Sequence, residues 1–258
     1  MLTKAEILKG LEPYKFAVGK PVIVHSSLKA VGRVESADWL LDILIEFFTK
    51  DGGLLCVPTH TWASDVYDMR QSYSNIGLLP RTAAARKDGV RTDHPTHSMA
   101  IFGDGAGEFA KGDGDTDTPA SPKGCLGKLF DMGGYVLLLG VNNTKNTYIH
   151  FVEEKLNVKN RLTDYKVERT VIYNDGTTVK KHLYWFDERV CDDVSANFFK
   201  FEPAFYHHGI VTDSQIGGAK TQLLAARDIF SVIEKIYKNC GGAELLADEK
   251  PLDKGLYI

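Results

Sequence analysis

Residues 137–154, LLLGVNNTKNTYIHFVEE, combine an apolar strand, a polar turn and the start of a helix. The apolar run at 135–139, closed by Gly140, is typical of a strand buried on both faces. Residues 142–146 have the composition of a turn, and Asn146 or Thr147 can cap the helix that follows. Ligands bind at such strand-to-helix junctions in open α/β sheets. This stretch therefore indicates both the fold class and the place of a site.

The flanking sequence extends the same α/β pattern in both directions. Apolar runs at 22–25 and 54–57 predict buried strands, and helical spacing of apolar residues at 37–49 predicts a helix between them. This order implies parallel strands joined by a crossover helix. Helices are also predicted at 3–11, near 80–88, at 103–111 and, as two stretches, near 219–239, with a long loop at 59–81. An Asn-Asp-Gly turn between two β-rich runs predicts a hairpin inserted at about 164–187.

Composition limits the classes of protein that fit. The 258 residues are 43% hydrophobic and 25% charged, enough for one core, and we expect a single α/β domain over 1–258. A net charge of −3 argues against a nucleic-acid partner, which requires a basic surface. No apolar run reaches membrane-spanning length, and the first residues resemble a capped helix rather than a signal peptide. The four cysteines share no CxxC spacing, so we expect free thiols and a cytoplasmic location.

His150 is the best candidate for a general base. It falls in the first turn of the predicted helix, where the positive end of the helix dipole favours a neutral imidazole. Glu153 is three residues away and shares its face, and a second acidic cluster follows the hairpin. The other interpretation is an exposed helical histidine with ordinary acidic neighbours. From the residues alone, the carboxylate that orients His150 could come from Glu153 or from Asp187, Glu188, Asp192 or Asp193.

Two further clusters allow other chemistry. His94 and His97, with Asp93 or His60, would form an incomplete zinc set, because zinc requires three or four converging ligands. The alternative is a loop whose histidines bond backbone groups or line a pocket. The acidic residues at 113–117 do not follow the EF-hand rule, so the loop is either solvated or a rim that attracts polycations. No GxSxG elbow and no complete dinucleotide fingerprint is present.

Taken together, several short segments resemble the aminoglycoside 3-N-acetyltransferase family. They occur in the order of the family and cover about residues 15–240. The segments are HSSLKAVG at 25–32, PTHTW at 58–62, NIGLLP at 75–80, HPTHSMA at 94–100, SP at 121–122, LGV at 139–141, NTYIHFVE at 146–153 and IGGA at 216–219.

The resemblance implies a three-layer α/β/α fold around a mixed, largely parallel sheet, unrelated to the GNAT acetyltransferases. It also implies transfer of acetyl from acetyl-CoA, as cosubstrate and without a metal, to a small-molecule amine. His150 would be the base, oriented by Asp187 or Glu188 in preference to Glu153. The CoA arm would be held by residues of four matching segments, namely His25, Ser26, Ser27, Leu28, Val31, Gly32, Pro58, Thr59, His97, Ser98 and Met99.

The acceptor half of the site carries fewer motifs. We expect a polycationic, aminoglycoside-like amine that contacts Asp68, His94 and Asp115, bound by a monomer or homodimer without a nucleic-acid or membrane partner. Transfer would be direct, in a ternary complex. Two departures from the family pattern are residues 81–85, where an aromatic helix is usual, and Asp93 before the His-Pro pair. The alternatives are a metal-dependent amidohydrolase using His94 and His97, and a non-catalytic CoA-binding protein of the same fold.

Overall fold

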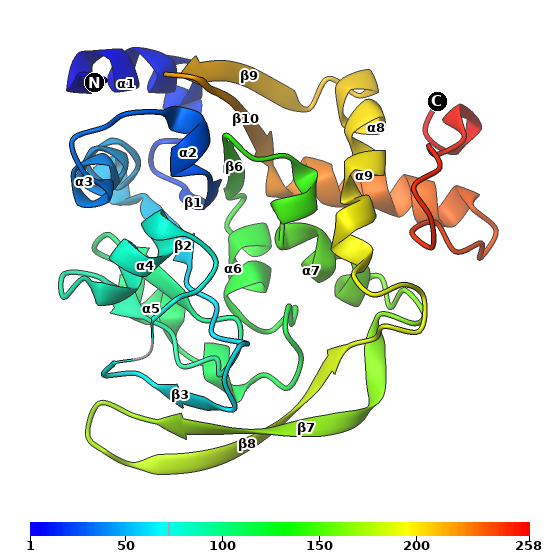
Figure 1. Ribbon diagram of the computed structural model, residues 1–258. Coiled ribbons are helices and arrows are strands. Elements are labelled where there is room, and N and C mark those ends of the chain that lie inside the picture. Colours follow the sequence, from blue (N-terminus) through cyan, green and yellow to red (C-terminus); the bar gives the residue numbers. More distant parts are fainter. Residues whose placement is uncertain (72) are drawn as a thin grey trace.

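A seven-stranded mixed sheet forms the centre of the protein (Figure 1). The computed structural model describes residues 1–71 and 73–258. The strand order is β4-β5-β2-β1-β6-β10-β9. The strands are β1 (Pro21–Ser26), β2 (Leu54–Pro58), β4 (Val90–Arg91), β5 (Met99–Phe102), β6 (Tyr135–Leu139), β9 (Val211–Ile216) and β10 (Ala219–Ala225).

Among the described residues of this sheet, parallel pairing is confined to the three central strands β2, β1 and β6. β1 pairs in parallel with β2 on one side and with β6 on the other. The pairs β2–β5, β4–β5, β6–β10 and β9–β10 are antiparallel. The predicted strand–helix–strand crossover is confirmed, since α3 (Ala37–Phe48), capped by Ser36, connects β1 and β2. Because the central strands are parallel, their carboxyl ends meet at one edge of the sheet.

Helices cover both faces of this sheet, so the α/β prediction with three layers is confirmed. Side chains that alternate along β1 enter two separate cores, with Val22 and Val24 on one face and Ile23 on the other. The first core lies under α1 (Lys4–Leu11), α3 and α4 (Leu78–Ala85). The second lies under α5 (Ala106–Ala110), α6 (Cys125–Asp131), α7 (Tyr148–Lys155), α8 (Glu202–His207) and α9 (Ala226–Asn239). A four-residue helix, α2 (Leu28–Val31), follows β1.

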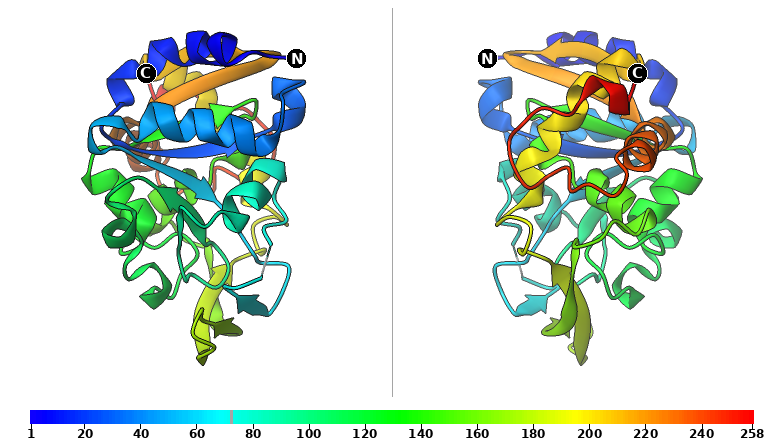
Figure 2. Two further views of the ribbon diagram at one scale, coloured as in Figure 1. Left: turned by 90° about the vertical axis from the view of Figure 1, so that its left-hand side faces the viewer. Right: turned by 90° about the vertical axis from the view of Figure 1, so that its right-hand side faces the viewer.

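A second, three-stranded sheet lies at the end of the molecule opposite the N-terminal helix (Figure 2). The predicted hairpin provides β7 (Leu162–Ile172) and β8 (Thr178–Phe186), which pair in antiparallel register. On its other edge, β7 pairs in parallel with β3 (Val66–Asp68). The hairpin ends at Phe186, so the acidic residues that begin at Asp187 follow it directly in the chain.

Two predictions about local structure are wrong. Residues 219–225 form β10 rather than a helix, because pairing with β6 and β9 buries Leu223 and Leu224. The predicted loop at 59–81 contains β3 and the start of α4, and Ser72 within it lies outside the described residues. In the described part of the chain, no helix is long and apolar enough to cross a membrane.

Candidate active site

A cavity of about 540 Å³ opens at the edge where the central strands end. Its walls combine the last residues of β1 and β2, the turn between β6 and α7, and the segment that follows the hairpin. This matches the position at which α/β sheets bind ligands. The polar and aromatic lining includes His25, Ser26, His60, Trp62, His97, Lys145, His150, Trp185, Phe186, Asp187 and Glu188.

The turn after β6 positions His150. Gly140 has φ of +70°, and a Cβ atom there would lie 2.7 Å from Ala30 Cβ, so the close approach of α2 favours glycine. The Asn146 side chain accepts a hydrogen bond from the N–H of Tyr148 (3.2 Å), which confirms one of the two predicted caps. The Thr147 side chain makes no capping bond. His150 is therefore the third residue of α7 and borders the cavity from the first turn of that helix.

His150 lies between aromatic rings and a carboxylate. Its ring stacks on Phe186 with centroids 4.1 Å apart, and Phe198 meets it edge-on at 4.8 Å. Nδ1 of His150 is 3.7 Å from Oε2 of Glu153. That separation is longer than a hydrogen bond, as is common for catalytic pairs without bound substrate. The helix thus brings together the base candidate and a carboxylate, with the ring held in place by two apolar neighbours.

Asp187 borders the same cavity but has a partner of its own. Its carboxylate accepts hydrogen bonds from Nε (2.6 Å) and from the backbone N–H (2.9 Å) of Arg189. The side-chain hydrogen bond from Arg189 is the main reason that the pKa of Asp187 is lowered. Glu188, Asp192 and Asp193 follow it and are exposed. These four carboxylates form an acidic rim, a name used below for Asp187, Glu188, Asp192 and Asp193.

Three buried histidines line the cavity. Burial lowers the pKa of His25 to about 3 and the pKa of His60 and His97 well below the usual range, so all three are neutral near pH 7. The His60 and His97 rings are 4.4 Å apart, and Trp62 packs on both. Neither ring nitrogen of His60 has a hydrogen-bond partner among the described residues. These histidines therefore offer uncharged donors and acceptors to the cavity.

Comparison with known proteins identifies the family. The model of the aminoglycoside 3-N-acetyltransferase family matches residues 23–238. The chain belongs to the aminoglycoside 3-N-acetyltransferase family. It is accordingly an acyltransferase.

Curated relatives and solved structures agree with this assignment. Aminoglycoside N(3)-acetyltransferase IV from Salmonella sp. is 26% identical over 88% of this chain and 84% of its own. A mutant of aminoglycoside acetyltransferase AAC(3)-IVa in complex with a gentamicin is 25% identical, with a TM-score of 0.73 over 90% of this chain and 87% of its own. The structure of AAC-IIIb with CoASH shares the fold at 20% identity, with a TM-score of 0.76 over 89% of this chain and 94% of its own.

Of the eleven residues predicted to hold CoA, four border the cavity of this acetyltransferase and seven are not among its lining residues. His25, Ser26, Pro58 and His97 border the cavity itself. Ser27 caps α2, which contains Leu28 and Val31 and ends at Gly32. Thr59 and Ser98 share a hydrogen bond between their hydroxyls (3.0 Å), and Met99 follows at the start of β5.

The predicted acceptor residues lie away from this cavity. Asp68 is buried, and its carboxylate accepts hydrogen bonds from Arg70 and Gln71. Asp115 is in a short 3₁₀ turn outside the cavity lining. Both ring nitrogens of His94 have polar partners. Nδ1 accepts a hydrogen bond from the backbone N–H of His97 (2.9 Å), and Nε2 lies 3.1 Å from the carbonyl oxygen of Thr118. None of the three is brought together with His150.

A zinc-hydrolase arrangement is not supported by these contacts. The two ring nitrogens of His94 already have partners in the acetyltransferase, and His97 Nδ1 lies 2.9 Å from the Thr96 hydroxyl. Over residues 1–71 and 73–258, no group of three or more His, Cys, Asp or Glu is placed to hold a metal ion.

Several residues that contribute to the site belong to no recognisable sequence motif. Lys145 and Trp185 both line the cavity. Lys145 lies in the predicted turn and Trp185 near the end of β8, and neither segment contains a recognisable motif at that position. Arg161 and Tyr237 contact Glu153 from segments 8 and 84 residues away along the chain. The alternation of β8 could have indicated one inward-facing aromatic residue near its end. For Arg161 and Tyr237 the sequence holds no comparable signal.

Proposed function

We propose that the protein transfers acetyl from acetyl-CoA to an amine of an aminoglycoside-like substrate, with His150 as the general base, and that residues 1–258 act as one domain. The observation that carries this proposal is the position of His150. It borders a cavity at the carboxyl ends of the parallel strands, 3.7 Å from a buried carboxylate and next to the acidic rim. A base with this environment suits an acceptor that arrives as an ammonium group.

The acyl donor is inferred from the family and from the lining of the cavity. A relative of the same fold binds CoASH. In this chain the matching Ser-rich segment forms the end of β1 and the cap of α2, beside the cavity. Ser26 Oγ is buried there without a partner among the described residues. We assign the pantetheine arm to this side, with Lys145 available to a phosphate group at the opening.

The acceptor is inferred from charge. The acidic rim places four carboxylates within seven residues at the cavity, and three of them are exposed. Such a concentration of negative charge attracts a polycation through its local field as well as by contact. A relative binds a gentamicin, which supports an aminoglycoside as the acceptor.

The proposed reaction is a direct transfer. His150 accepts a proton from the ammonium group, and the free amine attacks the thioester carbonyl, forming the C–N bond. The nitrogen of the tetrahedral intermediate loses its second proton to water, and the intermediate expels the CoA thiolate, which takes the proton held by the imidazolium, so one proton is released to solvent overall. Glu153 stabilises that imidazolium, and the Ser26 hydroxyl is available to donate to the oxyanion. No acyl-enzyme is formed.

The test is a thiol-release assay with acetyl-CoA against a panel of aminoglycosides and simple amines. We expect turnover with polycationic acceptors, and intersecting initial-rate lines that reflect a ternary complex. His150→Ala should lower kcat by about 10²–10⁴-fold with little change in CoA affinity. Wild-type turnover in that variant, or acetyl label retained on the denatured enzyme, would refute the mechanism. Binding of acetyl-CoA without transfer to any amine would favour the non-catalytic alternative.

A further inference from the structure

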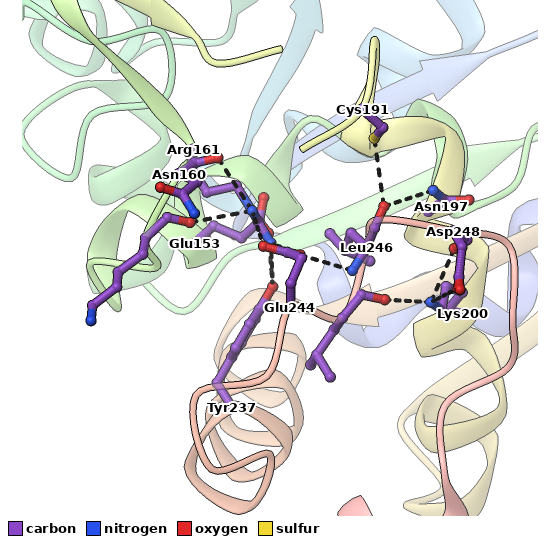
Figure 3. A network of polar contacts seen from close by, with 12 residues as sticks. Glu153, Asn160, Arg161, Cys191, Asn197, Lys200, Tyr237, Glu244, Leu246 and Asp248 are labelled. Atoms are coloured by element: carbon purple, nitrogen blue, oxygen red, sulfur yellow. Dashed lines mark hydrogen bonds and ion pairs between the residues drawn. The ribbon is translucent and has the colours of Figure 1, made fainter. Parts of the chain in front are cut away.

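The two oxygens of Glu153 have different environments. Oε1 accepts hydrogen bonds from Nε of Arg161 (2.5 Å) and from the hydroxyl of Tyr237 (2.9 Å), as Figure 3 shows. Oε2 is buried, has no hydrogen-bond partner among the described residues, and lies 3.7 Å from Nδ1 of His150. A carboxylate that is anchored by one oxygen and leaves the other directed at a histidine has a fixed orientation.

We propose that Arg161 and Tyr237 are positioning residues, which hold Glu153 as an oriented carboxylate against His150. This inference rests on the proposed role of His150 as the base. Neither residue borders the cavity, and both act on the reaction only through Glu153.

The turn that follows α7 places Arg161 next to Glu153. Asn157 and Asn160 have φ of +53° and +57°, the left-handed conformation that asparagine tolerates better than most residues. The turn they make brings Arg161 back over the helix, where it is only 4% exposed. Such a buried guanidinium requires paired acceptors, because an unpaired buried charge is strongly unfavourable.

A second carboxylate completes the cluster from the C-terminal segment. Glu244 accepts two hydrogen bonds from the Nη atoms of Arg161, at 2.8 and 2.9 Å, and thereby makes a bidentate pair (Figure 3). One guanidinium between two carboxylates leaves the cluster with an excess of one negative charge. A proton taken up by His150 during the reaction balances that excess. The cluster is therefore suited to stabilise the imidazolium.

Tyr237 contributes an uncharged donor. Burial and the neighbouring Glu153 raise the pKa of Tyr237 well above its usual range, so its hydroxyl keeps its proton. That proton is donated to Oε1, and the phenolic oxygen accepts a hydrogen bond from Nη2 of Arg161 (3.2 Å). Removing the hydroxyl alone would loosen Glu153 and leave the aromatic ring and the Arg161 ion pairs in place.

The test is a double-mutant cycle between Tyr237→Phe and Glu153→Gln, read out as kcat and as KM for both substrates. We expect Tyr237→Phe alone to lower kcat about tenfold, with both KM values within roughly twofold of wild type. In the Glu153→Gln background the same change should cost less than about twofold, because the oriented carboxylate is already absent. If Tyr237→Phe does not fold, Arg161→Lys takes its place in the cycle.

Tyr14→Phe is the matched control. It removes another buried hydroxyl, which lies 2.7 Å from the Thr221 hydroxyl on the opposite face of the sheet. We expect it to alter stability but leave kcat unchanged. An equal loss in both backgrounds, or no loss in the wild-type background, would overturn the positioning role. The proposed base is tested separately, because wild-type activity of His150→Ala would refute it whatever the cycle shows.

Discussion

At the scale of single residues, two carboxylates are candidates for the group that orients His150. Glu153 lies 3.7 Å from its Nδ1, whereas the carboxylate of Asp187 is held by Arg189. We therefore expect Glu153→Gln to lower kcat by roughly 10-fold to 100-fold and Asp187→Asn by less than about threefold. Steady-state kinetics at saturating acetyl-CoA measure both effects. The reverse order would assign the role to Asp187, one of the two carboxylates that the family resemblance suggested.

A contact within this site could be predicted from the sequence only where the two residues are close together along the chain. Glu153 and His150 are three residues apart on a helix, and helical geometry alone places them on one face. Arg161 reaches Glu153 through a turn that depends on two left-handed asparagines, and Tyr237 reaches it from another helix. Contacts of the second kind depend on tertiary packing, which no local pattern encodes. His150 and Glu153 were therefore predictable from the sequence, whereas Arg161 and Tyr237 were not.

At the scale of elements, Glu154 joins α7 to the loop at 116–120. Its carboxyl accepts hydrogen bonds from the Thr118 hydroxyl (2.5 Å) and the Ala120 N–H (2.8 Å). Burial raises its pKa from 4.5 to about 7. The folded state therefore holds this proton more tightly than the unfolded state. The stabilising contribution is complete below pH 4.5 and is lost as the pH rises through 7.

Glu154→Gln should remove that dependence, because the amide can accept from Ala120 and donate to Thr118 without carrying charge. We expect the variant to match wild type near pH 4 and to be about 3 kcal/mol more stable at pH 8. Urea unfolding at the two pH values measures the difference. Glu35→Gln, at an exposed position, is the control and should show no such gain. Equal stability of Glu154→Gln and wild type at pH 8 would contradict the assignment.

The elements also explain where the fold prediction succeeded and failed. The central strands were recognisable because burial on both faces gives continuous apolar runs, such as 135–139. β10 resembles a helix in sequence because its run of small and apolar residues continues directly into α9 at Ala226. Short apolar runs are ambiguous between strand and buried helix, and only the partners of β10 in the sheet resolve the ambiguity.

At the scale of the whole molecule, charge is distributed unevenly. The chain has 31 Lys and Arg against 34 Asp and Glu, so its net charge of −3 is small. Four carboxylates nevertheless gather in the acidic rim, and Glu188 and Asp192 make no ion pair among the described residues. A polycationic acceptor therefore approaches a local negative field on a nearly neutral protein. Salt screens such a field, since the Debye length is about 10 Å at 0.1 M.

This charge distribution predicts how KM for the acceptor depends on salt concentration. We expect KM for a polycationic aminoglycoside to rise several-fold between about 50 and 300 mM NaCl, because salt screens the attraction of the acceptor to the rim. We expect kcat to stay nearly constant, because screening does not change the reaction at His150. The double variant Glu188→Gln/Asp192→Asn should raise KM at low salt and reduce its salt dependence. A simple monoamine acceptor is the control and should respond weakly in both proteins. An unchanged salt dependence in the double variant would show that the rim does not attract the acceptor, and would direct attention to the acidic loop at 113–117 instead.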